Sequence, residues 1–357
     1  MNRYGALTVC IAWLGMILAI VNLYRSSIYR LSVLTGSDVW VSDVGSENDG
    51  IGRNVTLEAV VAESNRIREN ITHWVALGDV KDSVFGYGRF AKPFVFMKKV
   101  DANTGALPLQ HDFVTHLGSR LAANGQTIRF MEIGVSVLKS VHVKANFFTG
   151  ADITAVDIED PNPTIERLWK DKAFVETWTE SSMGSGDMRL GHKGRTNMYV
   201  ARYDGPRSNT IFYVTGDSRN SATWRHLAKN IAQPRGPMNL ILSDGYHTAA
   251  NVVTEMEHLR NYGIVNQTRT SDHFAMVWDD CAGAIQKVVY RKLFPMLHSI
   301  FFDRPVCHGH FFIHGWIGLL EREHSTCVFT TLDLFGPHLG ASTTWRPSHA
   351  SITCSPK

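Results

Sequence analysis

The amino-acid sequence predicts an α/β protein whose sheet is doubly wound and mainly parallel. Five strand-like segments alternate with helix-like segments between about residues 127 and 297, and a hairpin-like pair of strands follows them. Alternation of this kind implies right-handed crossovers, which leave successive strands parallel. A long uncharged segment near the N-terminus also predicts a transmembrane helix before the α/β domain.

The bulk composition fits one sizeable globular domain with an appendage. The chain has 357 residues, of which 44% are hydrophobic and 19% charged, and its formal net charge is +3. It has no cluster of Lys and Arg interleaved with aromatic residues, so we expect no nucleic-acid partner. The 5 cysteines allow several disulfide pairings or none, and they leave the redox compartment open.

The N-terminal segment predicts a membrane anchor. Residues 4–24 carry no charge and are long enough to span a bilayer as a helix. A cleaved signal peptide is the alternative, but no clear small-x-small cleavage site follows the segment. Basic residues flank both sides and leave the orientation open. We favour a single-pass anchor at 1–25 with a lumenal catalytic domain in the Golgi or ER, and glycosylation sequons stand at Asn54, Asn70 and Asn266.

The rest of the chain divides into three parts. Residues 26–100 are predicted to form a stem and N-terminal extension, 101–336 the α/β domain, and 337–357 a C-terminal tail. The apolar spacing within 109–125 predicts a helix that Asn124 and Gly125 end.

The predicted elements of the α/β domain follow in order. Strands are expected within 127–135, 152–160, 209–218, 238–245 and 272–280, and the helices that follow them within 138–148, 164–169, 221–232, 248–263 and 282–297. Gly263 is expected to end the fourth of these helices. Residues 310–335 predict two strands joined by the charged turn "EREHS", which would add an antiparallel hairpin.

Acidic residues stand at the end of each of the five predicted strands. In open α/β sheets ligands bind outside the carboxyl ends of the strands, near the point where the strand order reverses. That edge is therefore the predicted functional site, and its candidate residues are Glu132, Gly134, Asp157, Asp217, Ser218, Asp244, Asp279 and Asp280.

The motifs "MEIGVS", "AVDIED", "VTGDS", "LILSDGYH" and "MVWDD" occur in this order. The ordered set resembles class I S-adenosylmethionine-dependent methyltransferases, and is most similar to metal-dependent O-methyltransferases of the macrocin (macrolide-sugar) type. The resemblance covers about residues 105–335. It implies a Rossmann-like fold, S-adenosyl-L-methionine as cofactor, and methyl transfer to a hydroxyl group of a sugar, a glycan or another hydroxylated small molecule.

A metal site is predicted from Asp244, Asp279 and Asp280. Three carboxylates from neighbouring strand ends suit Mg²⁺ or Mn²⁺ better than Zn²⁺. The resembled family holds its divalent ion on an Asp after the fourth strand and an acidic pair after the fifth, which are these positions. The alternative is that Asp279 and Asp280 cap the next helix.

His247 is the candidate general base, with Asp244 as the second catalytic residue. In the resembled family a His at this position takes the proton of the substrate hydroxyl, which metal coordination makes more acidic. The alternative is that His247 caps the helix that begins near Thr248.

The resemblance implies a cofactor site on four strand ends. Glu132 and Gly134 match the first acidic-glycine motif, Asp157 is the expected ribose ligand, and Asp217 with Ser218 would lie beside the adenine. The sequence departs from the family pattern at Val137 and Leu138, which stand where glycine is common. This departure favours a second hypothesis, a non-catalytic Rossmann-like binding protein.

Two further interpretations have less support from the sequence. A metal-dependent hydrolase would have to use the same acidic residues, because no other nucleophile-activating group is evident. In "CHGHFFIH" the residues Cys307, His308, His310 and His314 are close in sequence, but no second Cys/His cluster at zinc-finger spacing accompanies them. We interpret these histidines as strand and cleft residues.

Overall fold

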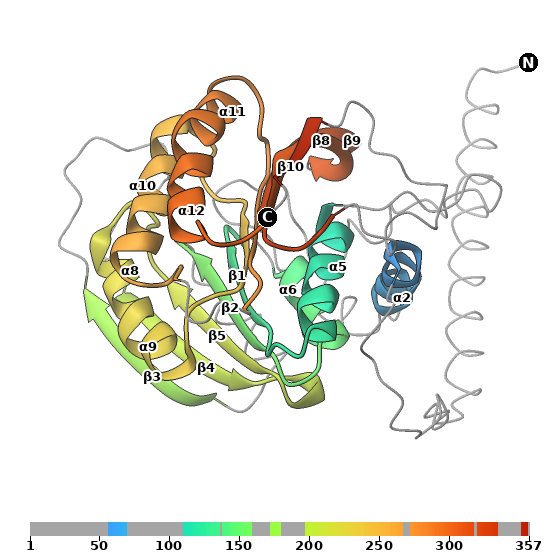
Figure 1. The fold of residues 1–357 in the computed structure, drawn as a ribbon. Helices are drawn as coiled ribbons and strands as arrows, with labels where there is room; N and C mark the ends of the chain where they lie inside the picture. Colours follow the sequence, from blue (N-terminus) through green and yellow to red (C-terminus); the bar gives the residue numbers. More distant parts are fainter. Residues whose placement is uncertain are drawn as a thin grey trace, which may run out of the picture. The chain divides into compact units, whose positions relative to one another are not determined.

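A 10-stranded sheet organises the part of the chain that the structure describes (Figure 1). This part of the computed structural model comprises residues 56–69, 110–135, 138–158, 172–179, 197–266, 272–317, 320–334 and 351–355. The strand order is β10-β8-β9-β7-β6-β1-β2-β5-β4-β3.

The central strands of the sheet are short, and the longest two strands are β8 and β9. Their bounds are β1 Arg129–Ile133, β2 Asp152–Asp157, β3 Lys172–Thr179, β4 Asn197–Asp204, β5 Thr210–Thr215, β6 Leu240–Ser243, β7 Ala275–Trp278, β8 Val306–Ile317, β9 Leu320–Thr330 and β10 Ser351–Ser355.

The helices flank these strands. They are α2 Leu57–Glu69, α5 Gln110–Ala123, α6 Lys139–Phe147, α8 Ser221–Leu227, α9 Gln233–Arg235, α10 Ala249–Asn261, α11 Gly283–Val288 and α12 Phe294–Ile300. Two π-helical segments, η3 Ala228–Ala232 and η4 Val289–Leu293, join α8 to α9 and α11 to α12, and η2 Pro206–Ser208 is a single 3₁₀ turn.

The centre of the sheet is parallel, as the sequence predicts. Strands β5, β2, β1, β6 and β7 pair in parallel in that order. The chain runs from β1 to β2, crosses to β3 at the edge of the sheet, comes back inward through β4 and β5, and then passes to the other side of β1 for β6 and β7. The strand order therefore reverses between β1 and β6. The predicted antiparallel hairpin is also confirmed, because β8 pairs with β9 and β9 pairs with β7 in antiparallel fashion.

The central strands are buried on both faces. Leu240, Ile241 and Leu242 of β6 are all fully buried, as expected for a strand covered on both sides. One core lies between the sheet and helices α5 and α6, and includes Leu117 and Val141. The other lies under α8, α10, α11 and α12. Figure 1 shows these two groups of helices on opposite sides of the sheet.

Several helix boundaries follow the predicted signals. Helix α5 ends at Ala123, and Gly125 then adopts a left-handed φ of 76° that a side chain would disfavour. Helix α10 ends at Asn261, and Gly263 has a φ of 67°. The predicted helix within 282–297 is present, but its middle is the π-helical segment η4.

Two predictions about strands are wrong in detail. The charged segment "EREHS" lies inside β9, because Ile317 of β8 already pairs with Leu320 of β9 and the segment comes after that pair. The antiparallel strands β3 and β4, which extend the sheet beyond β5, were not predicted. The apolar run Met198–Ala201 of β4 is compatible with a strand, but its pairing with β5 is a tertiary event that local pattern does not show.

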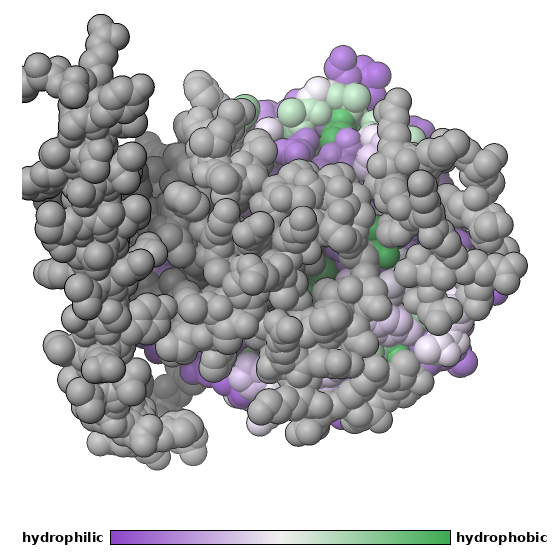
Figure 2. Space-filling model, turned by 180° about the vertical axis from the view of Figure 1, so that it is seen from behind, coloured by the Kyte–Doolittle hydropathy of each residue, from purple (hydrophilic) through white to green (hydrophobic). Residues whose placement is uncertain are grey.

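Other predictions lie outside the described residues. These are the anchor at 1–25, the helix at 164–169, most of the stem and the tail up to residue 350. Within the described residues, no helix has the length and apolar character needed to cross a membrane. In the coloured part of the face drawn in Figure 2, hydrophobic and hydrophilic residues lie side by side.

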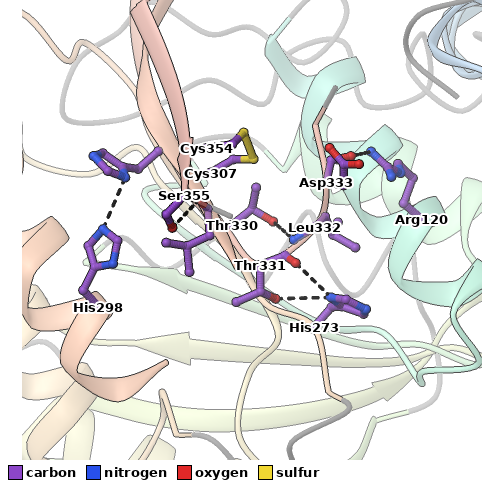
Figure 3. Close-up of a disulfide and its surroundings, with 12 residues drawn as sticks. Arg120, His273, His298, Cys307, Thr330, Thr331, Leu332, Asp333, Cys354 and Ser355 are labelled. Atoms are coloured by element: carbon purple, nitrogen blue, oxygen red, sulfur yellow. Dashed lines mark hydrogen bonds between the residues drawn. A yellow bond between two sulfur atoms is a disulfide. The ribbon is translucent and has the colours of Figure 1, made fainter. Parts of the chain in front are cut away.

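Two disulfides fasten the antiparallel strands. Cys281 is bonded to Cys327, and Cys307 is bonded to Cys354. Figure 3 shows the second bridge, which joins β8 to the edge strand β10. Close by, the guanidinium of Arg120 on α5 donates a hydrogen bond of 2.6 Å to the carbonyl of Asp333, just after β9.

Candidate active site

The carboxyl ends of the parallel strands are linked by backbone hydrogen bonds that continue past the strands themselves. Gly216 donates to Asp157, Gly134 to Val156, Asp244 to Ile133, and Asp279 to Ser243, with donor–acceptor distances of 2.7–3.0 Å. The first residues after β5, β1, β6 and β7 therefore lie in one row. This row contains three of the predicted site residues, Gly134, Asp244 and Asp279. Asp157 accepts the bond from Gly216, and the other predicted residues lie within three residues of the row in the sequence.

Gly134 and Asp244 are in close contact at the point where the strand order reverses. Gly134 has a φ of 85°, and a Cβ at this position would collide with the carbonyl group of Asp244 and with Gly245. Only glycine satisfies both requirements, the left-handed backbone and the missing side chain. Gly134 was predicted to allow the close approach of a cofactor. The close approach in the structure is between the loop of Gly134 and the loop of Asp244.

Asp244, His247 and Asp279 form a compact group. One ligand atom from each of the three side chains lies within 4.8 Å of the other two. Nε2 of His247 is 3.2 Å from Oδ1 of Asp244, and both side chains remain about a quarter exposed, at 27% and 26%. Two carboxylates and an imidazole at this spacing can bind one divalent cation that arrives from solvent.

Asp280 lies outside this group, and neither acidic residue caps a helix. Its backbone has a φ of 48°, and its side chain is exposed. The predicted alternative of a cap is wrong, because the N-cap of α11 is Ala282 and it has no side-chain cap bond. His247 is not a cap either, since Thr248 caps α10 by accepting the N–H of Asn251. The structure thus groups His247, and not Asp280, with Asp244 and Asp279.

The charges in this group shift its pKa values. Burial raises the pKa of Asp244 well above its usual value, and the charge of Asp279 raises it further, while the hydrogen bond from His247 lowers it. Burial alone would lower the pKa of His247, but the hydrogen bond and charge of Asp244, with the charges of Asp279 and Asp280, raise it to about 9. At neutral pH His247 is therefore protonated and occupies the place of a cation between the carboxylates.

Gln110 fixes the position of Asp279, and no sequence pattern pointed to it. Its side-chain amide donates to Oδ1 of Asp279 at 2.8 Å and to Oγ1 of Thr326 at 3.2 Å. Gln110 is 3% exposed, although it is the first residue of α5. A glutamine at the start of a helix indicates a site residue only when its hydrogen-bond partners are known. Both partners of Gln110 are distant in the sequence.

A second unpredicted network supports the loop after β6. The buried carboxylate of Glu255 on α10 accepts hydrogen bonds from Ser243 at 2.9 Å and from Asn251 at 2.7 Å. Burial raises the pKa of Glu255, and the hydrogen bonds from Ser218, Ser243 and Asn251 oppose that shift. These contacts attach the end of β6 to α10 directly beneath the Asp244 loop.

Glu132 is engaged inside the protein. It is 2% exposed, accepts a hydrogen bond of 2.7 Å from Ser140, and lies 3.5 Å from the ammonium group of the fully buried Lys144. Lys144 also donates to Ser140. Burial raises the pKa of Glu132, and Lys144 and Ser140 oppose that shift. The carboxylate therefore joins β1 to α6.

The other predicted cofactor residues lie at the same edge. One carboxylate oxygen of Asp157 accepts the N–H of Val135 at 2.9 Å, which ties the end of β2 to the loop after β1. Asp217 is paired with Arg219, whose Nη2 is 2.6 Å from Oδ2. The carbonyl of Ser218 accepts the indole N–H of Trp224 at 2.6 Å. Ser218 also contributes a hydrogen bond to the buried Glu255.

Leu138 adopts the backbone conformation that glycine would favour. Its φ is 64° and its ψ is 18°, and it is the N-cap of α6. A left-handed leucine is strained by about 1–2 kcal/mol, but its side chain is fully buried in the core under α6. The loop after β1 therefore has a left-handed turn without a glycine there. Val137 lies outside the described residues.

The cluster "CHGHFFIH" does not assemble as a zinc site in the described part of the chain. Cys307 is bonded to Cys354, and His310 pairs with the hydroxyl of Tyr290 at 3.0 Å. His308 lies 3.2 Å from His298 on α12. The side chain of His314 lies outside the described residues.

No family model matches the sequence, and no curated protein is significantly similar to it.

Proposed function

We propose that the protein is an S-adenosyl-L-methionine-dependent O-methyltransferase assisted by Mg²⁺ or Mn²⁺, acting on a hydroxyl group of a sugar or glycan. The observation that carries the proposal is the convergence of Asp244, His247 and Asp279 beside Gly134, at the reversal of strand order. In doubly wound, Rossmann-like sheets this reversal is the usual ligand site. The sugar acceptor rests on the motif resemblance alone.

The side chains of the group fit a divalent metal ion. Two carboxylates with one imidazole suit Mg²⁺ or Mn²⁺, and the nitrogen ligand makes Mn²⁺ the better probe. Oδ1 of Asp279 is oriented by Gln110, the kind of outer-shell contact that fixes a ligand before the metal binds. Because His247 and Asp279 lie on different loops, one ion would hold the two loops together.

The loop after β1 fits a cofactor in part. Gly134 supports a tight turn at the reversal, and Asp157 sits at the end of β2, where a ribose is expected. The pairing of Asp217 with Arg219 and the burial of Glu132 leave less carboxylate available than the motif pattern implies. Asp157 is therefore the residue on which the cofactor proposal depends most.

When bound, S-adenosylmethionine supplies an electrophilic methyl group, and the divalent ion supplies a Lewis acid that makes the acceptor hydroxyl more acidic. For this role the His247 ring must be free of the ion, which Asp244 and Asp279 would then hold: the ring takes the proton of that hydroxyl at Nδ1 while Nε2 keeps its contact with Asp244. Asp244 orients the ring and stabilises the imidazolium that forms. The ring can act as a base only when neutral, and a cation held by the two carboxylates would offset the charges of Asp244 and Asp279 that raise its pKa.

A second candidate is a Rossmann-like binding protein without catalytic activity. It is favoured by the internal pairing of Asp217 and by the leucine in the turn after β1. Both functions predict a folded α/β domain. Only the first requires affinity for S-adenosylmethionine.

Calorimetric titration separates the two functions. We expect the full-length chain in detergent to bind S-adenosylhomocysteine in the presence of Mn²⁺, and to bind Mn²⁺ alone. Absence of S-adenosylhomocysteine binding both with and without Mn²⁺ would contradict a methyltransferase. Mn²⁺ binding without cofactor binding would support the binding protein.

We also propose a single-pass anchor at 1–25 and a lumenal domain of a Golgi or ER protein. The two disulfides support an oxidising compartment, since disulfides are rare in reducing ones. Asn266 of the third sequon is exposed, as a glycosylated residue must be. The test is extraction of cell membranes with carbonate. Release of the full-length protein into the wash would contradict a spanning helix.

A further inference from the structure

Both ends of the turn that carries Asp279 are attached to one residue of the neighbouring strand. Trp278 is the last residue of β7 that pairs with β9, and its partner is Cys327. Cys281 then forms a disulfide with the same Cys327. Asp279 and Asp280 are therefore the middle of a short loop that is closed by a strand pair at one end and a covalent bond at the other.

Hydrogen bonds reinforce this closure. The N–H of Cys281 donates to the carbonyl of Ser325 at 2.7 Å, and the Ser325 hydroxyl donates to the carbonyl of Cys281 at 2.6 Å. The next residue, Thr326, accepts from Gln110, and the same amide group of Gln110 donates to Asp279. Cys281, Cys327 and Thr326 are fully buried. The disulfide and the Asp279 carboxylate thus belong to one connected structure.

We infer that the Cys281–Cys327 disulfide positions Asp279 for metal binding. This inference rests on the proposed function, because it requires that Asp244, His247 and Asp279 bind a divalent cation. A carboxylate on an unconstrained loop loses conformational freedom when it binds a metal, and that loss weakens binding. The closed turn restricts the conformations of Asp279 before the metal binds, so less conformational entropy is lost on binding. It also maintains Asp280 at a φ of 48°, a conformation that a relaxed loop would avoid.

The second disulfide provides a matched control. Cys307 and Cys354 are separated by 47 residues in the chain and Cys281 and Cys327 by 46, so the two bridges close loops of nearly equal length. By the chain-entropy argument their effects on the unfolded chain should be similar. The control bridge joins β8 to β10, and β9 separates it from β7. Neither of its cysteines lies next to the turn that carries Asp279, whereas Cys281 is two residues after Asp279.

The test compares Mn²⁺ affinity in two double variants of the full-length chain, produced under oxidising conditions. We expect Cys281→Ala with Cys327→Ala to raise the Kd for Mn²⁺ at least tenfold, measured from the free-Mn²⁺ resonance. Cys307→Ala with Cys354→Ala should change it less than twofold, although both pairs lower the melting temperature measured without metal. Excess Mn²⁺ should restore occupancy in the first pair.

Equal Mn²⁺ affinity in the unaltered protein and in a folded Cys281/Cys327 variant overturns the inference, as does an equal loss in the control pair. If the unaltered protein binds no Mn²⁺, the proposed metal centre fails as well, which is a different result. Cys281→Ser with Cys327→Ser removes the same covalent bond but keeps nearly the same side-chain volume in the buried site. It should raise the Kd at least tenfold as well, and an unchanged Kd in this pair would overturn the inference even if the alanine pair does not fold.

Discussion

The amide group of Gln110 lies 2.8 Å from Oδ1 of Asp279, although 169 residues separate them in the chain. This hydrogen bond links the first residue of α5 to the loop after β7 and orients one candidate metal ligand. The neighbouring Asp280 has an exposed side chain that lies outside the compact group. Two adjacent aspartates therefore have different environments, which permits a direct comparison.

The first prediction uses this pair. Asp279→Asn should raise the Kd for Mn²⁺ at least tenfold, because one of two anionic ligands is lost from a hard-cation site. Asp280→Asn should raise it less than threefold. Mn²⁺ titration of both variants gives the comparison. A larger effect at Asp280 would restore the ligand set expected from the motifs.

The second prediction concerns Gly134. Gly134→Ala should destabilise the protein by several kcal/mol, because the new Cβ meets the Asp244 carbonyl group and the φ of 85° is left-handed. Gly125 has a similar φ of 76°, but a Cβ added there would meet no atom within 4 Å, so Gly125→Ala should cost only about 1 kcal/mol. Urea unfolding measures both. Similar costs would show that backbone strain alone matters at Gly134.

The third prediction is a pH dependence of metal binding. The pKa of His247 is raised to about 9, so its lone pair is protonated below that pH and a cation must displace the proton. Affinity for Mn²⁺ should therefore increase with pH by up to about tenfold per unit between pH 6 and 8. His247→Gln should flatten this dependence. The expected proton release can be measured calorimetrically in two buffers of different ionisation enthalpy, and its absence at pH 7 would contradict the prediction.

His116 provides a prediction about folding stability. It is fully buried on α5, and neither ring nitrogen has a hydrogen-bond partner among the residues that the structure describes. Burial, aided by the charge of Arg120, lowers its pKa from 6.5 to about 4. A lowered folded-state pKa contributes stability that is present above pH 6.5 and lost as the pH falls toward 4.

The resulting loss should be about 2 kcal/mol between pH 7 and pH 5, from 1.36 kcal/mol per pKa unit. His116→Leu should remove this share of the pH dependence, which urea unfolding at the two pH values would reveal. An identical slope in the variant and the unaltered protein would show that His116 accepts a proton without cost.

The fifth prediction compares the two ends of β2. Asp157→Ala should weaken S-adenosylhomocysteine binding ten- to a hundredfold or more, because hydrogen bonds from the ribose to a charged group are worth about 1.5–3 kcal/mol each. Asp152, at the opposite end of the strand, pairs with Arg235 at 3.3 Å. Asp152→Ala should reduce stability and leave the cofactor Kd unchanged. Asp157→Asn keeps an acceptor for Val135 and tests whether the charge itself matters.

The sequence by itself determined the class of the fold and the sheet edge at which the candidate residues lie. Fully apolar segments such as Leu240–Leu242, alternating with amphipathic helices, are typical of buried parallel strands between helical layers. Because parallel strands end at one edge, the acidic residues after them had to lie in a row. Both conclusions depend on local patterns that a single sequence contains.

Tertiary structure decided which of those residues meet. The compact group contains His247 in place of Asp280, whose backbone is left-handed and whose side chain is exposed. Gln110 joins the site through contacts with strands distant in sequence. The Cys281–Cys327 pairing, one of several that the sequence allows, follows from the antiparallel placement of β9 beside β7. Such contacts depend on the packing of distant segments, about which local propensity and spacing carry no information.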